Sequence, residues 1–84
     1  MLLKEKLKHI LIETLNLEGV TPEQILDDDI LFGDKFGLDS IDAVEIVFQV
    51  EQHFRVKIRD MKEGRPALQS INTLAAFIEA RRRP

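Results

Sequence analysis

The sequence predicts a small all-α bundle. Apolar residues recur at helical spacing in three segments, near residues 2–16, 40–54 and 73–82. No segment alternates apolar and polar residues convincingly enough to indicate a strand, although residues 55–58 do so briefly. The 84 residues, of which 44% are hydrophobic, suit one domain with a small core. We therefore expect a single helical domain over residues 1–84.

The first helix is expected over residues 2–16, because its Leu and Ile side chains repeat every three or four positions. Gly19 lies just beyond this segment, where a glycine suits the end of a helix. A short helical turn should follow, with Thr21 as its cap and Pro22 at its first position. Gln24 is placed to close a capping box with Thr21.

Residues 27–39 are expected to form a long loop between the first and second helices. The segment is rich in Asp and contains two glycines. Loops of this length in a compact domain are usually functional or disordered, and the apolar residues of this one argue against disorder. We expect five side chains to anchor the loop to the core: Ile30, Leu31, Phe32, Phe36 and Leu38.

The second helix is predicted over residues 40–54, with Asp39 or Ser40 as its N-cap. Asp42 adds negative charge to the first turn, where the helix dipole favours it. Ser40 thus lies where an irregular loop meets a helix. A helix start offers free backbone N–H groups and a positive dipole end, and both suit a phosphate ester.

A helical wheel separates three faces of this second helix. The core face holds Ala43, Ile46, Val47, Val50 and Phe54, and a polar face lies opposite it. A third group, which we call the apolar strip, consists of Ile41, Val44 and Phe48. The strip either packs under the long loop or the last helix, or it is exposed and docks on a partner. Its acidic rim of Asp42, Glu45 and Glu51 resembles the edge of a transient interface.

The C-terminal part of the chain is basic. Residues 55–65 contain five Lys or Arg residues and are expected to be irregular. Pro66 is predicted to begin a short helix over residues 66–70, and Asn72 to cap a last helix over residues 73–82. The apolar side of the last helix should consist of Leu74, Ala75, Phe77 and Ile78, with Ile71 leading in and Arg81, Arg82 and Arg83 at its end.

The net charge of −3 hides a strong asymmetry along the chain. Residues 1–17 carry three Lys and two Glu, a net +1, whereas residues 18–51 carry ten acids against one Lys, a net −9. Residues 52–84 carry eight Lys or Arg and three acids, a net +5. The acidic block surrounds Ser40, so it should attract basic partners and disfavour nucleic acid. An ordinary solvated surface is the alternative explanation.

The residues that most enzymes use for catalysis are missing or badly placed. There is no Cys, which excludes disulfides and thiolate chemistry. His53 is almost four turns beyond Ser40, and His9 has no carboxylate placed to orient it, so neither is expected to activate the serine. The acids at residues 27–29 lack the spacing of a calcium loop. We therefore expect neither an enzyme nor a metal site.

The chain also shows no sign of secretion or of membrane insertion. Its first residues mix charges with Leu, unlike a signal peptide, and no apolar run approaches the roughly 18 residues that span a bilayer. The expected location is the cytoplasm.

Residues 37–42, Gly-Leu-Asp-Ser-Ile-Asp, resemble the phosphopantetheine attachment signature of acyl carrier proteins. Val44 to Val47 and Glu51 continue the family's helix pattern. The common family form is Asp-Ser-Leu, and Ile41 stands here in place of Leu. The resemblance covers nearly the whole chain.

This resemblance implies a four-helix bundle with three longer helices and one short one. It implies that Ser40, with Asp39 beside it, accepts 4′-phosphopantetheine from a phosphopantetheinyl transferase that uses coenzyme A, and that the thiol of the arm carries acyl groups as thioesters. It places partner docking on the apolar strip and its rim: Ile41, Asp42, Val44, Glu45, Phe48 and Glu51. Val47, Val50 and Ile58 would line a space for the acyl chain.

The implied protein is a monomeric carrier that serves acyl-loading, ketosynthase-type and other acyl-processing enzymes with basic docking patches. The pathway would be fatty-acid, lipid or polyketide-type biosynthesis. Residues 31–33, Leu-Phe-Gly, resemble carriers of dedicated lipid or secondary-metabolite clusters, whereas residues 55–65 and the terminal arginines depart from the housekeeping pattern. Two alternatives stay open: a peptidyl or aminoacyl carrier, and an unmodified helical interaction module with Ser40 as a plain N-cap.

Overall fold

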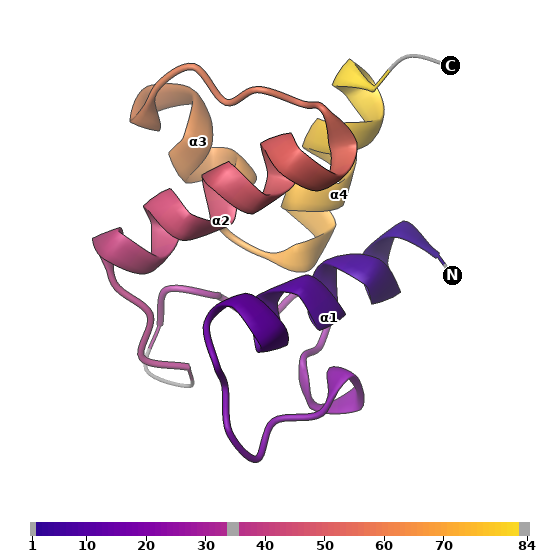
Figure 1. Ribbon diagram of the computed structural model, residues 1–84, viewed down its shortest axis with the longest axis vertical. Coiled ribbons are helices and arrows are strands. Elements are labelled where there is room, and N and C mark those ends of the chain that lie inside the picture. Colours follow the sequence, from indigo (N-terminus) through magenta and orange to yellow (C-terminus); the bar gives the residue numbers. More distant parts are fainter. Residues whose placement is uncertain (1, 34–35, 83–84) are drawn as a thin grey trace.

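The computed structural model describes residues 2–33 and 36–82, and these form an all-helical bundle. The elements are α1 (Leu3–Thr14), a 3₁₀ turn η1 (Pro22–Gln24), α2 (Ser40–Phe54), α3 (Met61–Ala67) and α4 (Ile71–Arg81). Three longer helices and one short helix are therefore present, and the described residues contain no strand, as the sequence predicts. Figure 1 shows α2 lying above α1, with the long loop in the lower half of the molecule.

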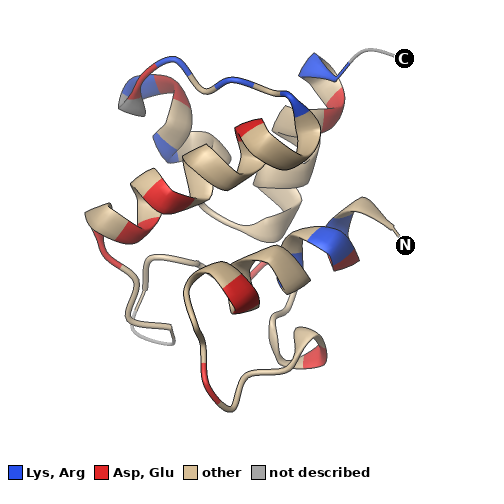
Figure 2. Cartoon of the chain, viewed as in Figure 1, with Lys and Arg blue, Asp and Glu red and all other residues tan. Residues whose placement is uncertain are grey.

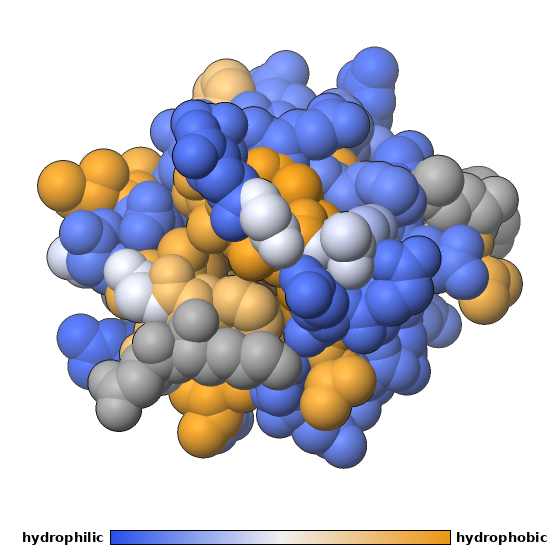
Figure 3. All heavy atoms as spheres, turned by 90° about the horizontal axis from the view of Figure 1, so that it is seen from below, coloured by the Kyte–Doolittle hydropathy of each residue, from blue (hydrophilic) through white to orange (hydrophobic). Residues whose placement is uncertain are grey.

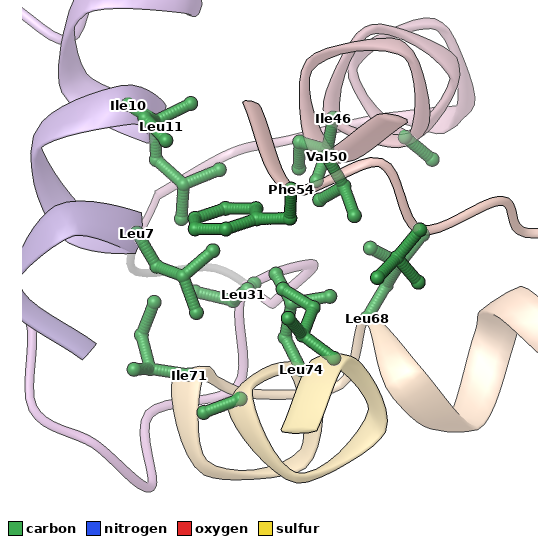
Figure 4. Packing of buried hydrophobic residues seen from close by; sticks show 14 of the residues in the cluster. Leu7, Ile10, Leu11, Leu31, Ile46, Val50, Phe54, Leu68, Ile71 and Leu74 are labelled. Atoms are coloured by element: carbon green, nitrogen blue, oxygen red, sulfur yellow. The ribbon is translucent and has the colours of Figure 1, made fainter. Parts of the chain in front are cut away.

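The core lies where α1, α2 and α4 meet. Ile46, Val50 and Phe54 point inward from α2, which confirms the core face predicted for that helix. The Phe54 ring extends toward Leu7 and Leu11 of α1 (Figure 4). The ammonium group of Lys6 lies 5.2 Å from the centre of the same ring. This packing fixes α2 relative to α1, and so fixes where its N-terminal end projects.

The long loop is held against the junction between α3 and α4. The Leu31 N–H donates to the Gln69 carbonyl at 2.9 Å, and the Asn72 N–H donates to the Asp27 carbonyl at 2.9 Å. The Asn72 side chain also donates to the Asp28 carboxylate. On the other side, the Lys8 ammonium pairs with the Asp27 carboxylate at 2.8 Å. The loop therefore contacts both α1, near the start of the chain, and the junction between α3 and α4, in its second half.

Four of the five predicted loop anchors contact the core. Leu31 is fully buried, and Phe32, Phe36 and Leu38 are partly buried against the core cluster. The prediction for Ile30 is wrong, because its side chain is 61% exposed. Leu31 uses both its backbone N–H and its side chain to face the bundle, and this orientation turns the preceding residue outward.

The predicted helix over residues 66–70 is wrong, because α3 begins at Met61. Asp60 caps it by accepting the Glu63 N–H at 3.0 Å, and the Glu63 carboxylate accepts the Arg59 N–H at 3.0 Å. Pro66 is therefore inside the helix, near its end, rather than at its first position. The irregular part of the basic segment shrinks to residues 55–60.

The last helix begins two residues earlier than predicted. Ser70, not Asn72, is its N-cap: the Ser70 hydroxyl accepts the Thr73 N–H at 3.2 Å, and the Thr73 hydroxyl accepts the Ser70 N–H at 2.9 Å. The Asn72 side chain is instead engaged by Asp28. Ile71 is fully buried as the first helical residue, so the predicted apolar side of this helix is confirmed with Ile71 inside it.

Candidate functional site

The start of α2 is organised by Asp39. One carboxylate oxygen of Asp39 accepts the N–H groups of Ile41 and Asp42, at 3.0 and 3.1 Å. In return, the Asp42 carboxylate accepts the Asp39 N–H at 3.0 Å, which completes a capping box. Of the two N-cap candidates that the sequence offered, Asp39 is thus the cap and Ser40 is not.

Ser40 is the first residue of α2, and its side chain is exposed. Among the described residues its hydroxyl makes no hydrogen bond, so the group is free for covalent chemistry. The expectation of several free backbone N–H groups at this helix start is wrong, because the capping box takes those of Asp39, Ile41 and Asp42. The Ser40 N–H is the one without a partner among the described residues.

A pocket of about 610 Å³ opens beside Ser40. Three elements build it: the long loop, the first turns of α2 and the C-terminal end of α3. Six of its ten lining residues are apolar and four are polar. The lining residues are Ile30, Phe32, Leu38, Asp39, Ser40, Ala43, Val44, Arg65, Leu68 and Gln69.

The sequence did not place this pocket. Val47, Val50 and Ile58 were expected to line the space for an acyl chain, and none of them lines the pocket beside Ser40. Val50 and Ile58 are buried and Val47 is partly buried, so the space that they were expected to line inside the bundle stays a prediction. Arg65 and Gln69 were not singled out as site residues, although Arg65 belongs to the basic segment. No sequence pattern predicts that Arg65 and Gln69 lie near Ser40, because their position depends on how α3 packs against the rest of the bundle.

The apolar strip of α2 is exposed. Ile41, Val44 and Phe48 have 78%, 64% and 52% of their surface accessible, so the strip does not pack under the loop or the last helix. Glu45 and Glu51 beside it are exposed, and Asp42 is partly buried within the capping box. Figure 2 shows these acids along α2. Figure 3 views the molecule from below and shows hydrophobic surface along its left edge, the side on which α2 begins in Figure 1.

Figure 2 shows Lys and Arg residues in the segment between α2 and α3, on α3, on α1 and near the end of α4. Arg81, the first residue of the terminal arginine run, makes contacts that stabilise the fold. Its guanidinium pairs with the Glu63 carboxylate at 2.5 Å and lies 4.2 Å from the centre of the Phe77 ring. Arg82 is exposed, and Arg83 lies outside the described residues.

The two histidines lie away from the candidate site. His9 and His53 are both exposed, and neither lines the pocket. The described part of the chain holds no cluster of His, Cys, Asp or Glu that could bind a metal ion. None of the described helices has the length and the apolar character needed to cross a membrane.

The fold and the site together define a small helical bundle that presents an exposed serine hydroxyl, unbonded by any described residue, at the start of its second helix and beside a mostly apolar pocket. The model of the family described as "Phosphopantetheine attachment site" matches residues 5–79. The chain is also similar to an acyl carrier protein of Solidesulfovibrio magneticus, with 29% identity over 82 residues, 98% of this chain and 97% of that relative. The chain belongs to the acyl carrier protein family, whose members carry a covalent 4′-phosphopantetheine group.

Proposed function

We propose that this protein carries acyl groups as thioesters on a 4′-phosphopantetheine arm attached to the Ser40 hydroxyl. The free, exposed hydroxyl of Ser40 is the observation that supports this most strongly. Because Asp39 serves as the cap, the hydroxyl has no structural task among the described residues that attachment would disturb. The mostly apolar pocket beside it suits the arm and a short acyl chain.

In the attachment reaction, the Ser40 oxygen would displace adenosine 3′,5′-bisphosphate from coenzyme A and form a phosphodiester. The serine proton must pass to a base on the transferase, since neither histidine of this chain lies at the pocket. When attached, the group supplies the thiol that forms the thioester. The protein's own part is to hold the serine rigidly at a capped helix start.

The apolar strip with its acidic rim is the proposed docking surface for the transferase and for acyl-processing enzymes. Ile41, Val44 and Phe48 supply the apolar centre, and Asp42, Glu45 and Glu51 the rim. Negative charge here would steer partners with basic patches and raise their association rate. Its position on the helix that begins with Ser40 brings a docked enzyme close to the carried group.

The pathway follows from the resemblance and stays a proposal: fatty-acid, lipid or polyketide-type biosynthesis in the cytoplasm. A peptidyl or aminoacyl carrier is the alternative within the same family. In the alternative of an unmodified interaction module, Ser40 would not serve as the N-cap, because Asp39 caps the helix; modification by the transferase separates this alternative from a carrier.

A loading assay tests the carrier function. The protein is first converted with coenzyme A and a phosphopantetheinyl transferase, then offered fatty-acyl and aminoacyl donors with their loading enzymes. We expect a hydroxylamine-sensitive fatty-acyl adduct on the wild type and none on Ser40→Ala. An aminoacyl adduct alone would favour the alternative carrier. No adduct from either donor, on protein that has gained the arm, would contradict an acyl carrier function.

A further inference from the structure

Attachment at Ser40 would place a phosphodiester in an acidic environment. The group carries one negative charge at neutral pH. Asp39 is the neighbouring residue and Asp42 lies in the same helical turn, and the carboxylates of both are tied into the capping box beside the serine. Like charges at this separation repel, so a bound phosphate needs a positive counterpart.

The start of α2 supplies little of that compensation. Phosphate groups at helix N-termini are usually held by free backbone N–H groups. Here Asp39 already accepts the N–H groups of Ile41 and Asp42, and its own N–H is taken by Asp42. The Asp39 carboxylate also offsets the positive end of the helix dipole. The counterpart must therefore come from another element.

Arg65 of α3 is the one cation among the described residues that line the pocket with Ser40. It is exposed and makes no ion pair or hydrogen bond within the described part of the chain, so its guanidinium donors are available. The helix that carries it is fixed at both ends. Asp60 caps its start, and the Leu68 N–H donates to the Gly64 carbonyl at 2.8 Å at its end.

We propose that Arg65 holds the phosphodiester of the arm and thereby directs the arm along the pocket between α2 and α3. This inference rests on attachment at Ser40. A guanidinium suits the task, because its planar set of donors matches two phosphate oxygens at once. Gln69, one turn further along the chain from Arg65, lines the same pocket and adds a neutral donor there. Arg65 is a positioning residue in this scheme and performs no chemistry.

NMR of the full-length protein before and after attachment tests this directly. We expect the Nε–H resonance of Arg65 to shift when the arm is attached. The shift should shrink at 1 M NaCl, because the Debye length falls from about 10 Å at 0.1 M to about 3 Å at 1 M salt. The ³¹P resonance of Arg65→Gln with the arm attached should differ from that of the wild type by more than a line width.

Arg59→Gln is the matched control, because it removes one guanidinium from an exposed position that does not line the pocket. Its ³¹P resonance should equal that of the wild type. The ³¹P resonance of Arg65→Lys should lie between those of the wild type and Arg65→Gln. Circular dichroism checks that each variant is folded, and the Nε–H readout of the wild type needs no variant.

The outcomes separate the inference from the proposed function. If the transferase adds no arm to the wild type, both fail. If the arm is added but neither the Arg65 Nε–H nor the ³¹P resonance responds, the inference alone is overturned. A response of Arg65 that occurs only after acyl loading would also overturn it, since the contact would then be with the carried group.

Discussion

At the residue scale, two neighbouring residues divide the work at the start of α2. Asp39 accepts the N–H groups of Ile41 and Asp42 in the first turn, and the exposed Ser40 hydroxyl makes no hydrogen bond within the described part of the chain. The second serine of the chain, Ser70, does the opposite. It is buried and caps α4 through a hydrogen bond from the Thr73 N–H. The exposed hydroxyl of Ser40 is therefore suited to modification, whereas the buried hydroxyl of Ser70 stabilises a helix.

Replacing each serine by Ala should separate these tasks. For Ser70→Ala we expect the free energy of unfolding to fall by about 1 kcal/mol, because a helix cap is lost, with attachment of the arm retained. For Ser40→Ala we expect a change within about 0.5 kcal/mol, as for surface positions without such a feature. Urea denaturation measures both values. A loss of about 1 kcal/mol in Ser40→Ala would show that its hydroxyl supports the helix.

At the element scale, α2 carries two separate apolar faces. One is buried in the core, and the other is the apolar strip, which remains exposed. Exposed apolar groups with a charged rim are typical of a surface that binds another molecule. Glu45 is the best single probe of this surface, because it is exposed and outside the capping box, whereas Asp42 belongs to the box.

Glu45→Lys should weaken docking without unfolding the protein. We expect kcat/KM for the transferase to fall about tenfold at low ionic strength, the lower end of the range for electrostatic steering. The difference in kcat/KM between Glu45→Lys and the wild type should become smaller in high salt, because the charges that steer the encounter are then screened.

Glu79→Lys is the control for this charge reversal, because Glu79 is exposed on α4, away from the apolar strip. It changes the net charge equally and should leave the rate within about twofold of the wild type, since steering depends on where the charge lies. Equal losses in the two variants would indicate that total charge, not a docking surface, sets the rate.

Elements with one dominant local signal could be predicted from the sequence. The bounds of α2 match, because its apolar period and its capping residues agree. The starts of α3 and α4 could not be predicted, because several capping residues compete there. For α3, Pro66 suggested a start, but the helix begins earlier, where Asp60 accepts the Glu63 N–H. For α4, Ser70 is the cap, and the Asn72 side chain donates to Asp28 instead.

At the scale of the whole molecule, the long loop joins distant parts of the chain. Asp27 accepts the Asn72 N–H through its carbonyl and binds Lys8, and more loosely Lys4, through its carboxylate. The hydrogen bond from Lys8 is the main cause that lowers the pKa of Asp27 below its ordinary value of 3.8. A single residue therefore couples α1, the loop and α4.

This coupling predicts a dependence of stability on pH. Because folding lowers the pKa of Asp27, its contribution to stability is complete above pH about 5 and is lost as pH falls through the unfolded pKa and then the lower folded pKa. At pH 7, Asp27→Asn should reduce the free energy of unfolding by about 0.5–1 kcal/mol, as expected for an exposed ion pair. At pH 2 the variant and the wild type should be equally stable.

Urea denaturation from pH 2 to 7 measures this difference, and Glu18→Gln is the control. Glu18 is exposed and makes no ion pair within the described residues. Its replacement should leave the pH profile unchanged. A constant deficit of Asp27→Asn across the whole range would mean that the ion pair does not contribute.

The candidate site could be predicted in part. The serine, the apolar strip and the acidic rim come from one continuous segment, whose period of 3.6 residues groups them on faces of a helix. The sequence left open whether the strip is buried, and the structure shows that it is exposed. The pocket could not be predicted, because Ile30, Ser40 and Arg65 come from three elements that meet only through tertiary packing.

Intact mass spectrometry after incubation with coenzyme A and a phosphopantetheinyl transferase is the most direct test of attachment at Ser40. We expect the wild type and Ser70→Ala to gain the mass of one phosphopantetheine group, and Ser40→Ala to gain none. An unmodified wild type, or a modified Ser40→Ala, would contradict the assignment of Ser40 as the attachment residue.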